Sequence, residues 1–170
     1  MAFSMTIGES DVWPPLPTMK ELIEAETKKV DFITSVAILN GFDYEVNGIT
    51  YHFSFGTEDQ SNFIQESVRA NMAVQNGTGD TYRAYWRGHT ANGATTLEFN
   101  LVEFMALLTY CGTNKSNLLS QGWDTKAKLS ACKTKVELKA LVKELDLDAK
   151  LRAAKATYAE LTAASEFADA

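Results

Sequence analysis

The chain has 170 residues, of which 45% are hydrophobic and 11% aromatic, and its formal net charge is −6 with a pI near 4.9. This composition can build one domain with a hydrophobic core, and it excludes wholesale disorder. The acidic balance, 16 basic against 22 acidic residues, excludes the basic surface that wraps nucleic acid, and no apolar run approaches the ~20 residues that span a bilayer.

All three prolines lie near the start of the chain, in the run Trp13-Pro14-Pro15-Leu16-Pro17. Proline has no backbone N–H to donate to a sheet or a helix interior, so residues 1–17 are predicted to form an extended arm. A stiff, partly apolar arm usually lies along another surface. We expect its contacts to come from four neighbouring residues: Trp13, Pro14, Pro15 and Leu16.

A first helix is predicted over residues 18–40, as a connector between the arm and the core. Thr18 and Glu21 have the spacing of a capping box, and Asn40-Gly41 suits a left-handed end. Apolar residues recur every three or four positions and give a packing face of Ile23, Val30, Ile33 and Ala37. The sevenfold spacing within this face would also suit a short coiled-coil seam, but Glu26 in a core-like position favours an ordinary amphipathic helix.

A tight β-hairpin is predicted over residues 42–55, with Asn47-Gly48 as a type I′ turn. This turn pairs Val46 with Ile49, Tyr44 with Tyr51, and Phe42 with Phe53, which places all the apolar pairs on one face. The polar pairs, Glu45 with Thr50 and Asp43 with His52, fall on the other face. A slip of one residue would scramble this sorting, so the turn and the alternation predict the same register.

A second helix is predicted over residues 58–75, started by a capping box of Thr57 and Gln60. Its apolar positions are Phe63, Ile64, Val68, Met72 and Val74. A second hairpin is then predicted around Asn92-Gly93, in which the arithmetic of a two-residue turn pairs Trp86 with Phe99 and Arg87 with Glu98.

The rest of the chain has helical patterns. Asn100 and Glu103 start a helix that continues, with interruptions at Gly112 and Gly122, to about residue 131, and Thr134 with Glu137 starts a short one. An Ala-rich helix follows. The sequence thus predicts an α+β fold with two Asn-Gly hairpins in a small antiparallel sheet packed against several helices. We divide it into an arm (1–17), a first helix (18–40), a core domain (41–145) and a C-terminal helix (146–170).

No catalytic or metal-binding constellation is apparent in the sequence. His52 and His89 lie on the polar sides of the hairpins, and neither cysteine has a CxxC neighbour. Cys111 and Cys132 fall in helical segments, where a disulfide is possible but nothing requires one. No secretory signal is visible in residues 1–10, so synthesis in a cytoplasm is expected. We therefore expect a non-enzymatic protein without a cofactor and without a nucleic-acid or membrane partner.

Three neighbouring aromatic residues, Tyr82, Tyr85 and Trp86, form a candidate ligand platform. Exposed aromatic rings stack against sugars, so such a platform would suit a glycan. The alternation of the strand instead favours their burial in the core.

The order of motifs over residues 41–142 resembles an uncharacterised domain found in bacteriophage tail-fibre and tail-associated proteins. The resemblance begins with Gly41-Phe42, continues through residues 47–51 (Asn-Gly-Ile-Thr-Tyr) and 59–64 (Asp-Gln-Ser-Asn-Phe-Ile), and then takes in Tyr85-Trp86, residues 99–103 and residues 131–140. The order Gln60-Ser61 inverts the pair usual in that family. The family has no assigned activity, so the resemblance implies a context and no catalytic residues.

That context is the virion. The resemblance implies a structural tail component (fibre, fibre-attachment or baseplate-associated protein), made in the cytoplasm of a host bacterium and assembled with other tail proteins. Such parts are commonly symmetric, and a homo-oligomer, in fibres a trimer, is expected. Three alternatives stay open: a host-surface glycan-binding module, a capsid decoration protein and a tail-fibre assembly chaperone.

Overall fold

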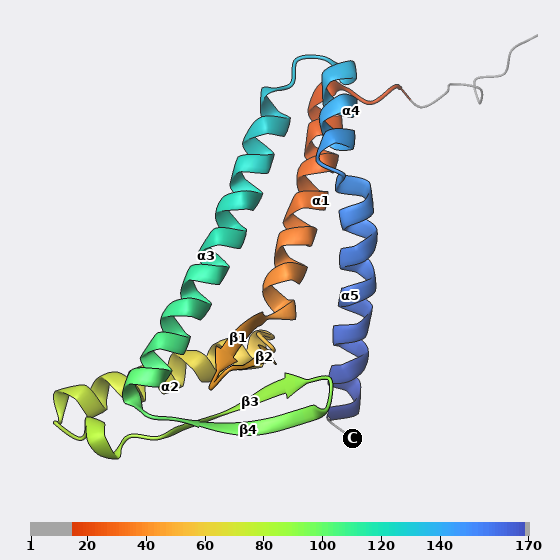
Figure 1. The fold of residues 1–170 in the computed structure, drawn as a ribbon. Coiled ribbons are helices and arrows are strands. Elements are labelled where there is room, and N and C mark those ends of the chain that lie inside the picture. The colour runs from red at the N-terminus through yellow and green to blue at the C-terminus, as the bar shows by residue number, and fades with distance from the viewer. Residues whose placement is uncertain (1–14, 169–170) are drawn as a thin grey trace, which may run out of the picture.

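The computed structural model describes residues 15–168, with side chains to residue 163 (Figure 1). The expected α+β class is confirmed: these residues form five α-helices and a four-stranded antiparallel sheet of two hairpins. The elements are α1 (Met19–Asn40), β1 (Phe42–Val46), β2 (Ile49–Phe53), α2 (Thr57–Gln75), the 3₁₀ turn η1 (Gly79–Thr81), β3 (Ala84–Thr90), β4 (Gly93–Phe99), α3 (Leu101–Ala131), α4 (Lys135–Glu144) and α5 (Leu147–Ala168).

Three long helices form the body of the molecule, with the sheet and α2 at one end and α4 at the other (Figure 1). The helix α1 contacts both α3 and α5. Two ion pairs clamp it to these neighbours: Lys29 Nζ lies 2.8 Å from Asp148 Oδ1, and Lys126 Nζ lies 2.7 Å from Asp31 Oδ1. The helix predicted as a connector is therefore the central helix of a bundle.

The first hairpin has the predicted register, with Phe42 opposite Phe53 and Val46 opposite Ile49. Asn47 and Gly48 both have positive φ, 53° and 79°, as a type I′ turn requires. Before the hairpin, Gly41 turns the chain out of α1 with φ 97°. A Cβ there would lie 1.9 Å from the Phe53 carbonyl oxygen, so only glycine fits.

The predicted register of the second hairpin is wrong. Ala84 lies opposite Phe99 and Trp86 opposite Leu97, so the two-residue turn is Ala91-Asn92. Gly93 follows the turn with φ 116° while Asn92 keeps a negative φ, as in a type I turn that ends in a left-handed glycine. The Thr90 hydroxyl, which accepts from the Asn92 N–H at 3.2 Å, holds this arrangement.

The helix starts follow the predicted caps except in α2. Thr18, Asn100 and Thr134 each cap a helix with the expected glutamate three residues on. At α2 the N-cap is Gly56, whose N–H donates to Asp59 Oδ2 at 3.0 Å. The predicted capping box of Thr57 and Gln60 is therefore wrong. The helix is capped one residue earlier, because the Asp59 carboxylate accepts the hydrogen bond from the Gly56 N–H.

The helix α3 runs unbroken through Gly112 and Gly122, where interruptions were predicted. Gly122 is buried because α1 crosses there: a Cβ at this position would lie 2.7 Å from Thr34 Oγ1. The glycine therefore allows close helix packing and does not end the helix.

Two hydrophobic clusters hold the fold together. The first lies at the sheet end, where Phe53, Phe99, Phe104 and Leu107 are almost fully buried. The second lies among α1, α3, α4 and α5, and its buried members are Val30, Leu129, Leu138 and Leu147. Because α3 contributes to both clusters, it joins the sheet end of the molecule to the α4 end.

Candidate functional site

The four arm residues fall partly outside the described range. Trp13 and Pro14 lie outside it, whereas Pro15 and Leu16 are described and exposed, with 85% of Leu16 accessible. In the described part of the arm, Lys135 Nζ on α4 donates a hydrogen bond to the Pro17 carbonyl at 2.8 Å. Where the described chain begins, it therefore lies beside α4.

The predicted packing face of the first helix contacts the chain's own helices. Val30 is buried, and Ile23 and Ile33 pack against the second cluster. Val30, Ile33 and Ala37 also line a half-open depression of about 240 Å³, together with Leu118, Gly122 and Leu147. This face therefore packs against the chain's own helices, with Val30 buried and the other three residues half-buried.

The three platform residues do not share one surface. Tyr82 is 4% exposed, and its hydroxyl donates to Glu66 Oε1 at 2.5 Å. The Arg69 guanidinium lies 4.6 Å from the centre of its ring. Burial, followed by the hydrogen bond to Glu66, raises the pKa of Tyr82 well above its ordinary range. Tyr82 is therefore a core residue with a satisfied hydroxyl, and no ligand reaches its ring.

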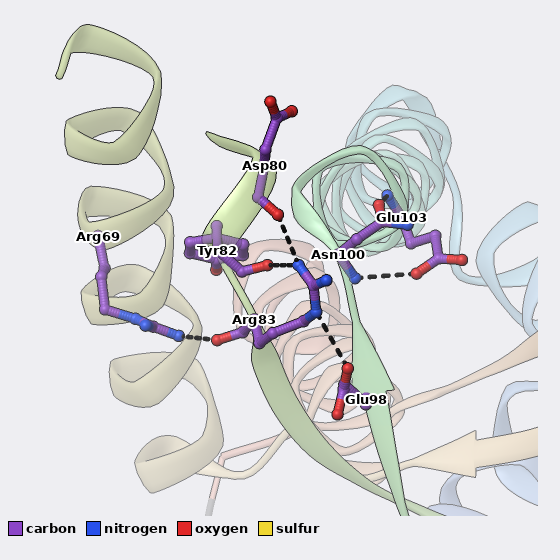
Figure 2. Close-up of polar contacts among 7 residues, drawn as sticks. All are labelled: Arg69, Asp80, Tyr82, Arg83, Glu98, Asn100 and Glu103. Carbon is purple, nitrogen blue, oxygen red and sulfur yellow. Dashed lines mark hydrogen bonds and ion pairs between the residues drawn. The ribbon is translucent and has the colours of Figure 1, made fainter. Parts of the chain in front are cut away.

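Arg83 fixes the chain where it enters β3 (Figure 2). Its Nη1 donates to the carbonyls of Asp80 at 3.0 Å and Tyr82 at 2.7 Å, and its Nε pairs with Glu98 Oε1 at 3.1 Å. From α2, Arg69 donates to the Arg83 carbonyl. These bonds join η1, β3, β4 and α2, so this cluster of charges stabilises the fold and does not form an open site.

Tyr85 and Trp86 do meet at one shallow depression of about 400 Å³. Tyr85 is 61% exposed, and a hydrogen bond to Glu98 raises the pKa of its hydroxyl. Trp86 is half-buried, with its ring centre 4.0 Å from that of Phe63. The other side chains of this depression are mostly polar: Ser54, Asp59, Asn62, Gln65, Glu66 and Arg87.

His52 is engaged on both sides of its ring. Nδ1 lies 2.8 Å from Asp43 Oδ1, and Nε2 lies 2.7 Å from the Asn40 carbonyl, at the end of α1. His89 lies opposite His52 in the pairing of β2 with β3. His52 therefore ties the sheet to the end of α1, and both of its ring nitrogens have a polar partner.

The two cysteines do not form a disulfide within one chain. Cys111 lies in α3 and Cys132 caps the end of that same helix, 21 residues and therefore ~31 Å further on. Cys111 is buried, which raises the pKa of its thiol to about 11. Cys132 is half-buried.

We expect one reactive thiol in the folded protein at pH 8, that of Cys132, and two after denaturation. Alkylation of Cys111 should accelerate only as the pH approaches about 11. The thiol of the unfolded chain ionises near pH 9, so the contribution of Cys111 to stability falls as the pH rises between these values. Thiol titration with and without urea measures this. Two rapidly reacting thiols in the folded protein would contradict the burial of Cys111.

The sequence did not predict the outward apolar ridge of α2, formed by Ile64, Val68 and Met72. Each of these is more than half exposed, as is Val74. The residues of α2 that face the core are Phe63, Ala70 and Ala73. Of the five apolar positions predicted for this helix, only Phe63 is buried: small alanines let α2 approach the sheet closely, and the other four side chains point outward.

A second uncovered strip lies on α4 and consists of Lys135, Val136, Lys139, Ala140 and Lys143. Val136 is 80% exposed. The strip lines an almost wholly apolar depression of about 420 Å³ between the lysine side chains. The periodicity of residues 135–143 gave a signal for it, since Leu138, Leu141 and Val142 already fill the opposite face.

Within residues 15–168, no three His, Cys, Asp or Glu side chains gather as ligands for a metal ion. None of the described helices combines the length and the apolar composition that crossing a membrane demands.

No family model matches the chain, and neither the curated proteins nor the solved structures contain a significant match to it.

Proposed function

We propose that this protein is a non-enzymatic structural component of a bacteriophage tail that acts by joining neighbouring proteins. The observation that carries the proposal is the pair of uncovered apolar surfaces, the α2 ridge and the α4 strip, at opposite ends of the body (Figure 1). Apolar rows of this kind mark interaction sites in folded proteins. A part with one such row at each end suits a link between two neighbours.

The exposed area of the chain supports this. The surface is 12199 Å², whereas a compact monomer of 18.8 kDa is expected to expose about 8,300 Å². Residues 1–14 and 169–170 account for at most about 2,500 Å² of this surface, the area of a fully unfolded chain of that length. The described residues therefore expose more surface than a compact monomer needs to, as expected for a subunit that buries surface on assembly.

The phage context comes from the order of motifs over residues 41–142 and remains part of the proposal. A homo-oligomer, a trimer in a fibre, and contacts with other tail proteins belong to the same proposal. Both hairpins of that motif series are scaffold in this fold, which suits a domain family without catalytic residues.

Deletion of residues 1–17 should leave the fold intact and abolish incorporation into phage particles. The deletion removes one described hydrogen bond, from Lys135 to Pro17, and keeps the Thr18 cap of α1. The melting temperature and the circular dichroism spectrum should therefore match those of the full chain. Incorporation is measured by blotting purified particles, with the exposed α5 substitution Lys155→Ala as the control. Normal incorporation of the truncated chain would contradict an assembly role for the arm.

A glycan-binding module is the second candidate, favoured by the depression that joins Tyr85 and Trp86 to Asn62 and Gln65. Sugar sites combine an aromatic face with amide and carboxylate groups. If this candidate is right, Tyr85→Ala should abolish binding on a glycan array with little change in melting temperature, because Tyr85 is 61% exposed. Equal binding by wild type and Tyr85→Ala, or no binding by either, would remove this candidate.

A further inference from the structure

We infer that the α2 ridge, formed by Ile64, Val68 and Met72, binds the same ridge of a second copy of this chain. The two α2 helices lie antiparallel, related by a twofold axis that passes at Val68. The inference rests on the proposed function, in which this ridge is a contact surface, and it names the partner at that ridge. It is carried by the shape of the ridge, by the absence of charge around it and by its area.

The α2 ridge is a single apolar row. Its three residues recur at intervals of four, so they lie along one side of the helix. Each of them is more than half exposed, while Phe63 and Ala70 on the other side of α2 are buried against the core. The helix lies at the sheet end of the molecule (Figure 1). Each residue of the row therefore keeps most of its side chain for a partner.

The side chains that flank the row are exposed, polar and uncharged: Ser61, Gln65, Asn71 and Gln75. Glu58 and Asp59 lie in the first turn of α2, before the row begins. The charged residues beyond that turn, Glu66 and Arg69, pair with each other on another side of the helix. The chain has a net charge of −6, so two copies repel wherever their carboxylates meet. On this face a second copy meets no like charge, and a partner held by ion pairs would find none to make.

An antiparallel pairing matches this face to itself. With the twofold axis at Val68, Ile64 lies beside the second copy's Met72, because both are four residues from the axis. Rows of residues four apart align when two helices cross at about −50°. Gln65 and Asn71 lie three residues on either side of the axis and form the polar rim. The same patch is thus used by both copies, as in other twofold contacts.

The paired face is small. Residues 64–72 span about 12 Å of helix, and a helix with its side chains is about 10–12 Å across. Contacts of this size fall below about 1,200 Å² of total buried area, the class of weak interfaces. We therefore expect a reversible dimer with a dissociation constant on the order of 10–100 μM.

Analytical ultracentrifugation of the full chain tests the pairing. We expect the mean mass to rise from 18.8 kDa towards twice that value as the concentration increases through the micromolar range. Val68→Glu places a carboxylate against its own copy at the axis and should raise the dissociation constant at least about tenfold. The control, Val102→Glu, makes the same change on α3, where Val102 is 78% exposed, and should leave the dissociation constant unchanged.

Disulfide trapping locates the axis without introducing a charge. In a Cys132→Ser background, where Cys111 is buried, Val68→Cys should form a covalent dimer in the presence of oxidised glutathione, because residues that face each other at the axis lie within reach of a disulfide. Val74→Cys is the matched control. Val74 is also an exposed valine of α2, but it lies six residues from the axis, so its two copies are about 16 Å apart. Equal yields of covalent dimer from the two variants would overturn the pairing.

Failure of this inference is distinguishable from failure of the proposed function. A full chain that stays monomeric, forms a trimer, or dimerises equally well as Val68→Glu overturns the pairing of the ridge with itself. If such a chain is still found in purified phage particles, the proposed function stands, and loss of Val68→Glu from those particles would show that the ridge binds another tail protein. Absence of the full chain from particles, whatever its mass in solution, contradicts the proposed function instead.

Discussion

Phe104→Ala should lower the free energy of unfolding by about 3–5 kcal/mol, the range for removing a fully buried phenylalanine. Phe104 is 0% exposed and lies where α3 meets the sheet end. Its ring centre is 6.3 Å from that of Phe63, 6.1 Å from Tyr82 and 6.4 Å from Trp86. The cavity left by the ring would border α2, β3 and the segment that leads into β3. These parts cannot all move in to fill it, so little of the lost packing energy should be recovered. Urea denaturation followed by circular dichroism measures the change.

Val102→Ala is the matched control for Phe104→Ala. It lies two residues away on α3 but is 78% exposed, so its effect should stay within ~0.5 kcal/mol. Similar losses for the two variants, or a loss below ~1 kcal/mol for Phe104→Ala, would contradict the first cluster as described.

Gly122→Ala should destabilise the protein by about 1–3 kcal/mol, the usual cost of forcing extra atoms into a packed contact. The added Cβ would lie 2.7 Å from Thr34 Oγ1. Few χ1 rotamers are allowed to the β-branched Thr34 side chain in a helix, so the contact is relieved only by a less favourable rotamer or by α1 and α3 moving apart. Thr34→Ala in the same background should restore most of the loss. Thermal and urea denaturation of the three proteins measure the coupling.

Gly112→Ala should change the free energy of unfolding in the opposite direction to Gly122→Ala. It lies on the same helix, with no atom within 4 Å of an added Cβ, so alanine should stabilise α3 by up to about 1 kcal/mol through helix propensity. Destabilisation of equal size at both glycines would contradict the close crossing of α1 and α3 at Gly122.

The sequence predicted the features that depend on neighbouring residues. The first hairpin follows from the Asn47-Gly48 turn and strict alternation, which agree on one register. The caps at Thr18, Asn100 and Thr134 follow from a glutamate three residues further on. These signals are local, so the rest of the fold does not change them.

The features that the sequence did not predict depend on contacts between distant segments or on a choice between similar turns. An Asn-Gly pair does not say whether glycine lies within the turn or just after it, and Gly93 lies after. The apolar residues of α2 are spread over all sides of the helix, so periodicity could not show that Ala70 and Ala73 face the core. Tyr82, Tyr85 and Trp86 are close in sequence, but strand alternation and the start of β3 give them different surroundings.

For the candidate site, composition predicts a contact role for the arm and does not say which surface it would contact. The α4 strip is visible as a row of lysines only once Leu138 and its neighbours are seen to be buried. The packing face of the first helix was predicted as apolar, and the structure shows that α3 and α5 cover it. Among the described residues, rows of exposed apolar side chains therefore include the α2 ridge and Val136 and Ala140 of the α4 strip.

Quantitative mass spectrometry of purified phage particles tests the structural role most directly. The proposed function predicts that the full chain is present at a fixed ratio to the other tail proteins after particle purification, and that the chain without residues 1–17 is missing from particles. A chain that is abundant in infected cells but absent from finished particles would contradict a structural role and would instead indicate an assembly chaperone. A chain that copurifies with tailless heads would indicate capsid decoration and would contradict the placement in the tail.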